Sequence, residues 1–164
     1  MTMQLDPLRF AKFYAAVMHA GKLYGGGLPY THHLSAVEQV ARRFRPDIEQ
    51  EVLEACWLHD SVEDTAAKVK DIKEMFGPKV AELVAAVTNE PGANRKIRGM
   101  LTYPKIREAD PRATFLKLCD RIANVEHGGN MLDVYRKEYE DFRRALFTPG
   151  YYEDMWTHLD GLLR

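Results

Sequence analysis

Two neighbouring pairs of ionisable residues follow an apolar stretch and have the types needed for metal or proton chemistry. His59 and Asp60 come directly after the apolar segment 55–58, and Glu63 and Asp64 follow about one helical turn later. If a helix continues through this segment, positions three and four apart share a face, and the four side chains project from one end of it. An imidazole with carboxylates can bind a divalent cation or transfer protons. The alternative is a helix end whose carboxylates are simply hydrated.

A further carboxylate stands in an apolar stretch far along the chain. Asp120 follows the segment 115–119, which reads FLKLC. Burial of a carboxylate there is costly unless it pairs with a cation or binds a metal, so pairing with Arg121 is the alternative to a metal-binding role. Three histidines nearer the N-terminus are additional candidate ligands: His19, His32 and His33. Together these side chains offer the imidazole and carboxylate groups that suit Mn, Fe or Zn, although periodicity alone does not bring them together.

The composition predicts one globular domain covering residues 1–164. Of the 164 residues, 46% are hydrophobic and 29% are charged, so the chain is too apolar to be disordered. A net charge of −1 gives no electrostatic reason to expect DNA or RNA as a partner, and two cysteines exclude a disulfide framework. We find no apolar run of membrane-spanning length and no secretory signal in the first residues. We therefore expect a cytoplasmic location and no membrane partner.

Helical periodicity dominates the sequence and predicts an all-α fold of about eight to nine helices. The predicted helices cover roughly 7–21, 34–44, 48–58, 69–76, 78–87, 94–109, 111–122, 131–146 and 152–163. Asp47 and Gln50 have the spacing of a capping box at the start of the third helix. The glycine-rich segment 25–30, GGGLPY, is expected to be a loop, and no segment alternates for long enough to predict a strand.

The segment 95–107 is strongly basic and could contact phosphate groups. It contains five cations: Arg95, Lys96, Arg98, Lys105 and Arg107. A polyphosphate substrate needs such groups, and arginine in particular offers bidentate contacts to phosphate. The alternative for most of these residues is a solvated helix face.

At the segment 58–65, LHDSVEDT, the chain resembles the HD superfamily of metal-dependent phosphohydrolases. More narrowly, it is similar to the hydrolase domain of RelA/SpoT homologues and to the small alarmone hydrolases. Three other parts of the chain carry the same resemblance: His19-Ala20-Gly21 followed by LPYTHH (28–33), FGPKVAELVAAVTNE (76–90) and LKLCDRIANV (116–125). The resemblance covers most of the chain and rests on all of these motifs in this order.

The resemblance implies a helical HD-type domain that holds one divalent metal ion, with Mn²⁺ as the expected ion. The ligands that it implies are His33, His59, Asp60 and Asp120. It also implies a catalytic role for Glu63 and Asp64 and a substrate contact for Asn124. Members of the family hydrolyse the 3′-diphosphate of guanosine tetra- and pentaphosphate, so the expected partner is a small nucleotide. Some relatives instead remove the 2′-phosphate of the reduced nicotinamide dinucleotide phosphate.

The expected substrate contacts follow the family less closely than the metal ligands do. Tyr24 stands where the family usually has an arginine that stacks on the purine, and an insertion would bring Lys22 to that position instead. Arg95 and Lys96 stand roughly where relatives carry basic residues that contact phosphate. Tyr135 is a further expected contact, because a relative has a tyrosine near that position.

Two other functions are compatible with the same residues. One is an HD phosphohydrolase for another phosphorylated nucleotide, such as an adenosine alarmone or the nicotinamide dinucleotide phosphate. The other is a nucleotide-sensing or partner-binding module built on the same helices. The complete set of four implied ligands with Glu63 and Asp64 argues against the module. The sequence is compatible with a homo-oligomer and does not determine the oligomeric state.

Overall fold

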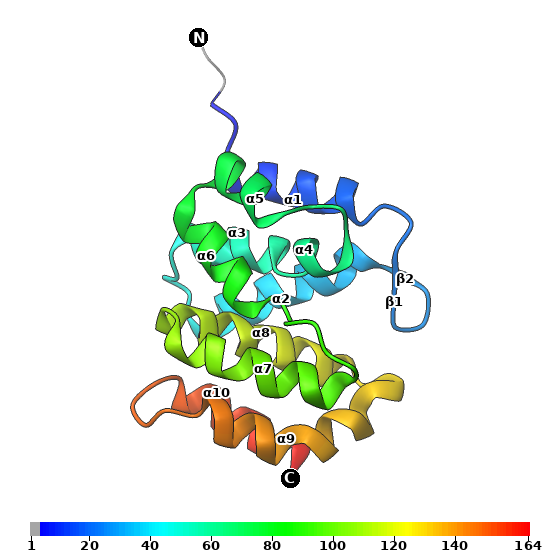
Figure 1. Cartoon of the computed structure of the whole chain (residues 1–164), viewed down its shortest axis with the longest axis vertical. Coiled ribbons are helices and arrows are strands. Elements are labelled where there is room, and N and C mark those ends of the chain that lie inside the picture. Colours follow the sequence, from blue (N-terminus) through cyan, green and yellow to red (C-terminus); the bar gives the residue numbers. More distant parts are fainter. Residues whose placement is uncertain (1–3) are drawn as a thin grey trace.

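The computed structural model describes residues 4–164, which form a stack of helices with a short hairpin at one side (Figure 1). The layers run from α1 and α5, through α3 with α6, to α7 with α8, and end at α9 and α10. The α-helices are α1 (Pro7–Met18), α2 (Tyr30–Phe44), α3 (Gln50–Leu58), α4 (Ser61–Asp64), α5 (Val69–Phe76), α6 (Pro78–Val87), α7 (Arg95–Glu108), α8 (Pro111–His127), α9 (Leu132–Leu146) and α10 (Glu153–Leu163). A 3₁₀ turn, η1 (Gly129–Met131), precedes α9, and the hairpin consists of β1 (Leu23–Tyr24) and β2 (Leu28–Pro29).

The all-α prediction is confirmed for the described residues. Nine of the helices in residues 4–164 have eight residues or more, and α4 is a single turn. The start of α1 is as expected from its sequence. Pro7 is the first residue of the helix, and the Asp6 carboxylate caps it by accepting a hydrogen bond from the backbone N–H of Leu8 at 3.2 Å. Gly77 separates α5 from α6 because its φ of 92° suits glycine, and Pro78 then begins α6.

The predicted capping box before the third helix is wrong. The N-terminal cap of α3 is Glu49, and no side chain caps this helix end. The amide of Gln50 instead donates to the carboxylate of Asp6 at 3.3 Å, so this side chain connects α3 to the start of α1. A tertiary contact here replaces the local hydrogen bond that the spacing predicted.

The glycine-rich loop contains a small hairpin that the sequence did not predict. Leu23 pairs with Pro29 and Tyr24 with Leu28 in antiparallel register. Gly26 and Gly27 allow the turn because their φ values are 80° and 92°. Two residues per strand are too few for an alternating pattern. The hairpin nevertheless brings Tyr24 and the start of α2 to the same side of the helix stack.

The core centres on α3 and α8, the two helices that precede or carry the candidate metal ligands. Every residue of α3 from Val52 to Leu58 is buried, and α3 packs against α1, α2, α6 and α8. In α8 the run from Leu118 to Ala123 is buried as well. Both cysteines, Cys56 and Cys119, are free thiols inside this core. In residues 4–164 we find no helix of the length and apolarity that a bilayer crossing requires.

Candidate functional site

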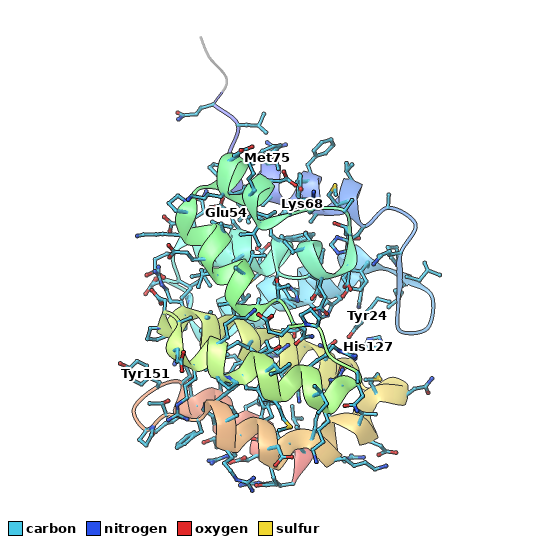
Figure 2. The ribbon with its side chains drawn as sticks, viewed as in Figure 1. Tyr24, Glu54, Lys68, Met75, His127 and Tyr151 are labelled. Atoms are coloured by element: carbon cyan, nitrogen blue, oxygen red, sulfur yellow. The ribbon has the colours of Figure 1, made fainter. Side chains whose placement is uncertain are left out.

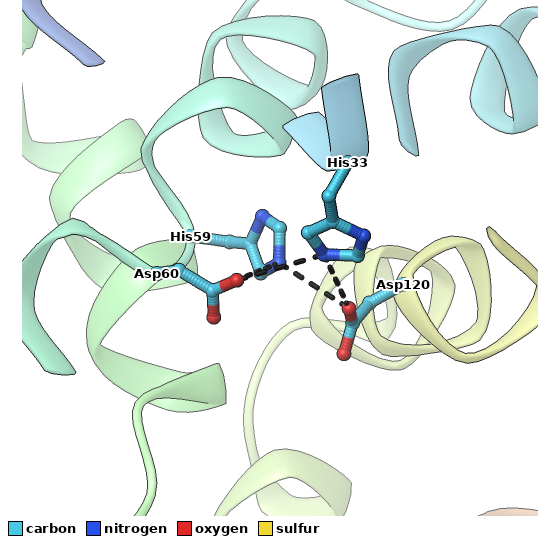
Figure 3. Close-up of side chains that lie close together, drawn as sticks. All are labelled: His33, His59, Asp60 and Asp120. Atoms are coloured by element: carbon cyan, nitrogen blue, oxygen red, sulfur yellow. Dashed lines mark ion pairs between the residues drawn. The ribbon is translucent and has the colours of Figure 1, made fainter. Parts of the chain in front are cut away.

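Four of the predicted side chains meet at one point in the fold, although they come from three separate segments (Figure 3). His33 lies in the first turns of α2, and Asp120 lies in the middle of α8. His59 and Asp60 occupy the two-residue break between α3 and α4, so the helix does not continue through them. One ligand atom from each of the four residues lies within 4.8 Å of all the others.

The spacing of these atoms fits a single metal ion. Nε2 of His59 lies 3.0 Å from Oδ2 of Asp60 and 3.4 Å from Oδ1 of Asp120. Nε2 of His33 lies 3.1 Å from the same Asp120 oxygen and 3.6 Å from the same Asp60 oxygen. An ion bound at about 2.1 Å places neighbouring ligand atoms about 3.0 Å apart at right angles and about 3.4 Å apart at tetrahedral angles. Three of the four observed separations lie within this range, and the fourth, 3.6 Å between His33 and Asp60, is slightly longer.

The orientation of His59 supports the same interpretation. Its Nδ1 lies 2.7 Å from the carbonyl oxygen of Cys56, which can only accept, so Nδ1 carries a proton. Nε2 is buried and has no hydrogen-bond partner among the described residues, while two carboxylate oxygens face it. Such a convergence of acceptor atoms is repulsive unless a cation or protons lie between them. The donor set therefore fits a divalent metal ion.

Electrostatics keep the two carboxylates of the site ionised. Burial alone would raise the pKa of Asp120, but the Lys117 ammonium and the facing imidazoles of His33 and His59 outweigh it and hold that pKa well below its usual value. Burial also opposes ionisation of Asp60, yet the facing imidazoles of His59 and His33 lower its pKa. The same carboxylates raise the pKa of His59 well above its ordinary value against the effect of burial. Metal binding at such a site displaces protons and strengthens as pH rises.

Each ligand carboxylate has support from a neighbouring side chain. The Lys117 ammonium lies 2.9 Å from Oδ2 of Asp120, and the Asn124 amide donates to Oδ1 of Asp120 at 3.0 Å. Both supports lie one turn from Asp120 on α8. Asp60 receives a hydrogen bond of 2.6 Å from the hydroxyl of Tyr30 at the start of α2. Asn124, predicted as a substrate contact, thus also touches a candidate metal ligand.

A polar cleft of about 180 Å³ opens beside the four ligands. Its lining includes Asn89, Tyr103 and the expected residues Asn124 and Tyr135. Four cations also line it: Arg95, Arg98, Lys117 and Arg121. This arrangement can take up a strongly anionic group next to a metal ion.

The two predicted catalytic carboxylates lie in different surroundings. Glu63 lines the cleft, and its carboxylate accepts hydrogen bonds from the backbone N–H of Asn89 at 2.8 Å and from the Asn89 amide at 3.3 Å. Asp64 is not among the cleft-lining residues. Burial, and then the charges of Asp60 and Glu63, raise the pKa of Asp64, while Lys22 and the Tyr30 hydroxyl oppose the rise. Lys22, the alternative to Tyr24 as a substrate contact, does not line the cleft.

The predicted phosphate contacts separate into one residue inside the cleft and one outside it. Arg95 lines the cleft, where Glu138 receives two hydrogen bonds of 2.8 Å from its guanidinium. Arg121 also pairs with Glu138 at 3.0 Å, so one carboxylate holds two arginines at this wall. Lys96 is not in the cleft lining and faces the neighbouring groove between α7 and α9.

Both the ring and the hydroxyl of Tyr24 contact other residues of the site. Its ring stacks on His33 with centroids 4.7 Å apart, and its hydroxyl donates to Oδ1 of Asn124 at 2.7 Å. The centroid of the His127 ring lies 4.8 Å from that of Tyr24, and Figure 2 shows the two side chains close together. Because His33 covers one face of the ring, the expected base stacking is restricted to what remains accessible. A Cβ at Gly25 would meet the exposed His127 ring, so a side chain at this position would displace that ring.

A second cavity adjoins the cleft on the hairpin side. Tyr24, His127 and Met131 line it, and Asn124 and Tyr135 line both cavities. Sequence reasoning missed Asn89, Tyr103, Lys117 and His127. Lys117 had a usable signal, because it stands three residues before Asp120 in a predicted helix. Asn89 and His127 had no local signal in the sequence, because their positions in the site arise from contacts between distant segments.

Comparisons with known proteins agree with this geometry. The family model described as "HD domain" matches residues 11–149. A guanosine-3′,5′-bis(diphosphate) 3′-pyrophosphohydrolase of Aquifex aeolicus is 35% identical over 137 residues, which are 81% of this chain and 19% of that protein. The enzyme of the same description from Drosophila melanogaster, MESH1, is 33% identical over 97 residues, which are 59% of this chain and 54% of that protein. The matched part is thus about half of the length of MESH1 and a smaller share of the other.

One solved structure is similar over nearly the whole chain. It is described as a metazoan ortholog of SpoT that hydrolyzes ppGpp, and the superposition has a TM-score of 0.84 at 25% sequence identity. It covers 99% of this chain and 96% of the other. The helical stack described above is therefore a known arrangement, and the cluster of His33, His59, Asp60 and Asp120 lies within the segment that the family model matches.

Proposed function

This chain belongs to the HD domain family, and we propose that it is a metal-dependent hydrolase that removes the 3′-diphosphate from guanosine tetra- and pentaphosphate. The observation that carries the proposal is the convergence of two imidazoles and two carboxylates beside a cleft lined by four cations. The described activities of the Aquifex and Drosophila relatives and of the similar solved structure support the choice of substrate. We propose that residues 1–164 form one HD-type domain.

His33, His59, Asp60 and Asp120 would hold one divalent ion, and we propose Mn²⁺ because imidazole and carboxylate ligands both suit it. When bound, such an ion lowers the pKa of a coordinated water and polarises a phosphoryl oxygen. The choice of Mn²⁺ and a cytoplasmic location remain predictions, and the oligomeric state stays open.

Glu63 has the position of the general base in this proposal. Its carboxylate lines the cleft, where it can accept a proton from the attacking water, and Asn89 fixes its direction through two hydrogen bonds. Asp64 is more shielded, and its pKa is raised by burial and by the charges of Asp60 and Glu63. A carboxyl group with a raised pKa is suited to return a proton to the leaving oxygen.

The two adjoining cavities would bind different parts of the substrate. Phosphate groups fit the polar cleft, where Arg98, Lys117 and Arg121 supply positive charge. The nucleoside fits the second cavity, whose walls combine aromatic rings with glycine backbone. Asn124 and Tyr135 line both cavities and so stand where the sugar would lie.

A second candidate substrate is the adenosine counterpart of the same nucleotide. The observation that favours it is the hydrogen bond from the Tyr24 hydroxyl to Asn124, because this hydroxyl is then no longer free to donate to a base edge. Strong discrimination between bases needs polar groups that stay unpaired with the wrong one. We therefore propose weak discrimination between guanosine and adenosine substrates.

The test uses protein stripped of metal and then supplied with Mn²⁺. Guanosine tetraphosphate should yield guanosine diphosphate and pyrophosphate, resolved by chromatography, and the matched adenosine substrate should react at a rate within about a hundredfold. The Asp64→Asn variant should bind the metal normally and turn over slowly. A folded, metal-loaded wild type that releases no pyrophosphate from either substrate would overturn the proposal. A guanosine preference above about a hundredfold, equivalent to about 2.7 kcal/mol, would overturn only the weak discrimination.

A further inference from the structure

Two motif residues that the proposed reaction does not use lie in contact beside the metal ligands. The rings of His19 and Tyr30 stack with centroids 4.8 Å apart and an interplanar angle of 6°. The Tyr30 hydroxyl donates a hydrogen bond of 2.6 Å to Oδ2 of Asp60. This is the Asp60 oxygen that faces both His59 and His33. The stack thus ends on an atom that would bind the metal ion.

The histidine of this stack is itself held firmly. His19 is 2% exposed, and its Nδ1 lies 2.9 Å from the carbonyl oxygen of Ala15, one turn earlier in α1. The backbone continues the link, because the Lys22 N–H donates to the His19 carbonyl at 2.9 Å and the Tyr30 N–H donates to the Lys22 carbonyl at 3.1 Å. The end of α1 and the start of α2 are therefore fixed against each other around the hairpin.

Asp60 needs such support more than Asp120 does. Asp120 lies within α8, where Lys117 and Asn124 hold its two oxygens. Asp60 lies in the break between α3 and α4. Among residues 4–164, its carboxylate receives a hydrogen bond from one hydroxyl, that of Tyr30, and from no amide. Without that hydrogen bond, rotation of the side chain would carry Oδ2 away from the two histidines.

We infer that Tyr30 is a positioning residue of the metal centre, which holds the Asp60 carboxylate in the ligand orientation and is itself held by the stacked ring of His19. The inference rests on the metal centre of the proposed function. Groups that orient a metal ligand typically contribute 10- to 100-fold to metal affinity. The Tyr30 hydroxyl orients Asp60 through its hydrogen bond, and the His19 ring orients Tyr30 by stacking on it.

The variant Tyr30→Phe tests the hydroxyl, because it keeps the ring that stacks on His19. Titration of metal-free protein with Mn²⁺ by calorimetry should give a Kd at least tenfold weaker than that of wild type. Activity relative to wild type should fall much further at limiting Mn²⁺ than at saturating Mn²⁺, where only the effect of the hydroxyl on Asp64 remains. A purely structural role for Tyr30 would not give this dependence on metal concentration.

Tyr139→Phe is the matched control. The Tyr139 hydroxyl also donates at 2.6 Å to a carboxylate, that of Asp160, in the α9–α10 region away from the metal ligands. Its removal should leave the Kd for Mn²⁺ unchanged. His19→Ala, which removes the stacked ring, should weaken Mn²⁺ binding, whereas His19→Phe, which keeps an aromatic ring, should stay within about threefold of wild type.

The outcomes separate the inference from the proposed function. If wild type binds Mn²⁺ and Tyr30→Phe binds it equally well, the inference is overturned and the metal centre stands. If wild type binds no Mn²⁺, the proposed metal centre fails, and the inference fails with it. Should Tyr30→Phe not fold, His19→Ala decides the question, because wild-type affinity in that variant would contradict the role of the stack.

Discussion

A buried carboxylate away from the metal ligands should make the stability of the protein depend on pH. Glu54 lies in α3 (Figure 2). Its exposed fraction is 4%. No hydrogen-bond donor to its carboxylate is present in the described part of the chain. Burial, with smaller contributions from the charges of Glu51 and Asp6, raises the pKa of Glu54 from 4.5 to about 7. The variant Glu54→Gln removes the charge and keeps the shape.

The expected magnitude follows from this pKa. Because the folded state binds the proton more tightly than the unfolded chain, wild type loses stability as pH rises from about 4.5 to about 7. The difference between the two values corresponds to an upper limit of about 3.5 kcal/mol, at about 1.4 kcal/mol for each pKa unit. Glu54→Gln should therefore be more stable than wild type at pH 8 by up to about 3.5 kcal/mol, and the difference should be much smaller at pH 5.

Urea unfolding at pH 5 and pH 8, followed by circular dichroism, measures this difference. In thermal unfolding the same effect should raise the Tm at pH 8 by roughly 2–4 °C for each kcal/mol. Glu82→Gln is the control, because Glu82 is an exposed carboxylate on α6 and its replacement should change little at either pH. An equal stability difference between Glu54→Gln and wild type at both pH values would refute the reasoning.

Three further outcomes are expected. Glu63→Gln should keep bound metal and lose at least about a hundredfold in kcat, since an amide cannot accept the proton; near-normal turnover would return this carboxylate to a solvated role. Glu38→Gln should lose about 2 kcal/mol in urea unfolding at pH 7, because the Glu38 carboxylate accepts the Trp57 indole N–H at 2.6 Å and pairs with two cations; an unchanged midpoint would contradict this. Cys56 and Cys119 should react with a thiol reagent only on unfolding, because burial raises the pKa of both thiols; fast labelling of native protein would contradict their burial.

Local patterns predicted the helices because the information for them lies within each segment. The 3.6-residue spacing of apolar side chains marks α6 and α8, and Pro78 and Pro111 mark their starts. The hairpin and the start of α3 were not predictable in this way. Two paired residues give no periodicity, and the Gln50 side chain bonds to Asp6, which is 44 positions away.

The candidate site was predictable in its ligand types and only partly in its surroundings. His59, Asp60 and Asp120 stand out because ionisable groups interrupt apolar segments. The choice of His33 over its neighbour came from the resemblance. The hydrogen bond from Tyr24 to Asn124 joins residues 100 positions apart, so no local pattern could predict that this ring packs inside the site. Contacts of this kind depend on how the hairpin packs against α8.

The most direct test of the account is the metal content of the purified protein measured together with its activity. Metal-free wild type titrated with Mn²⁺ should bind one ion per chain, and the rate of pyrophosphate release from guanosine tetraphosphate should rise in proportion to the bound metal. Asp120→Ala should bind no ion and show no activity while its circular dichroism remains helical. Full activity in protein that contains no metal and is unaffected by chelators would contradict the account.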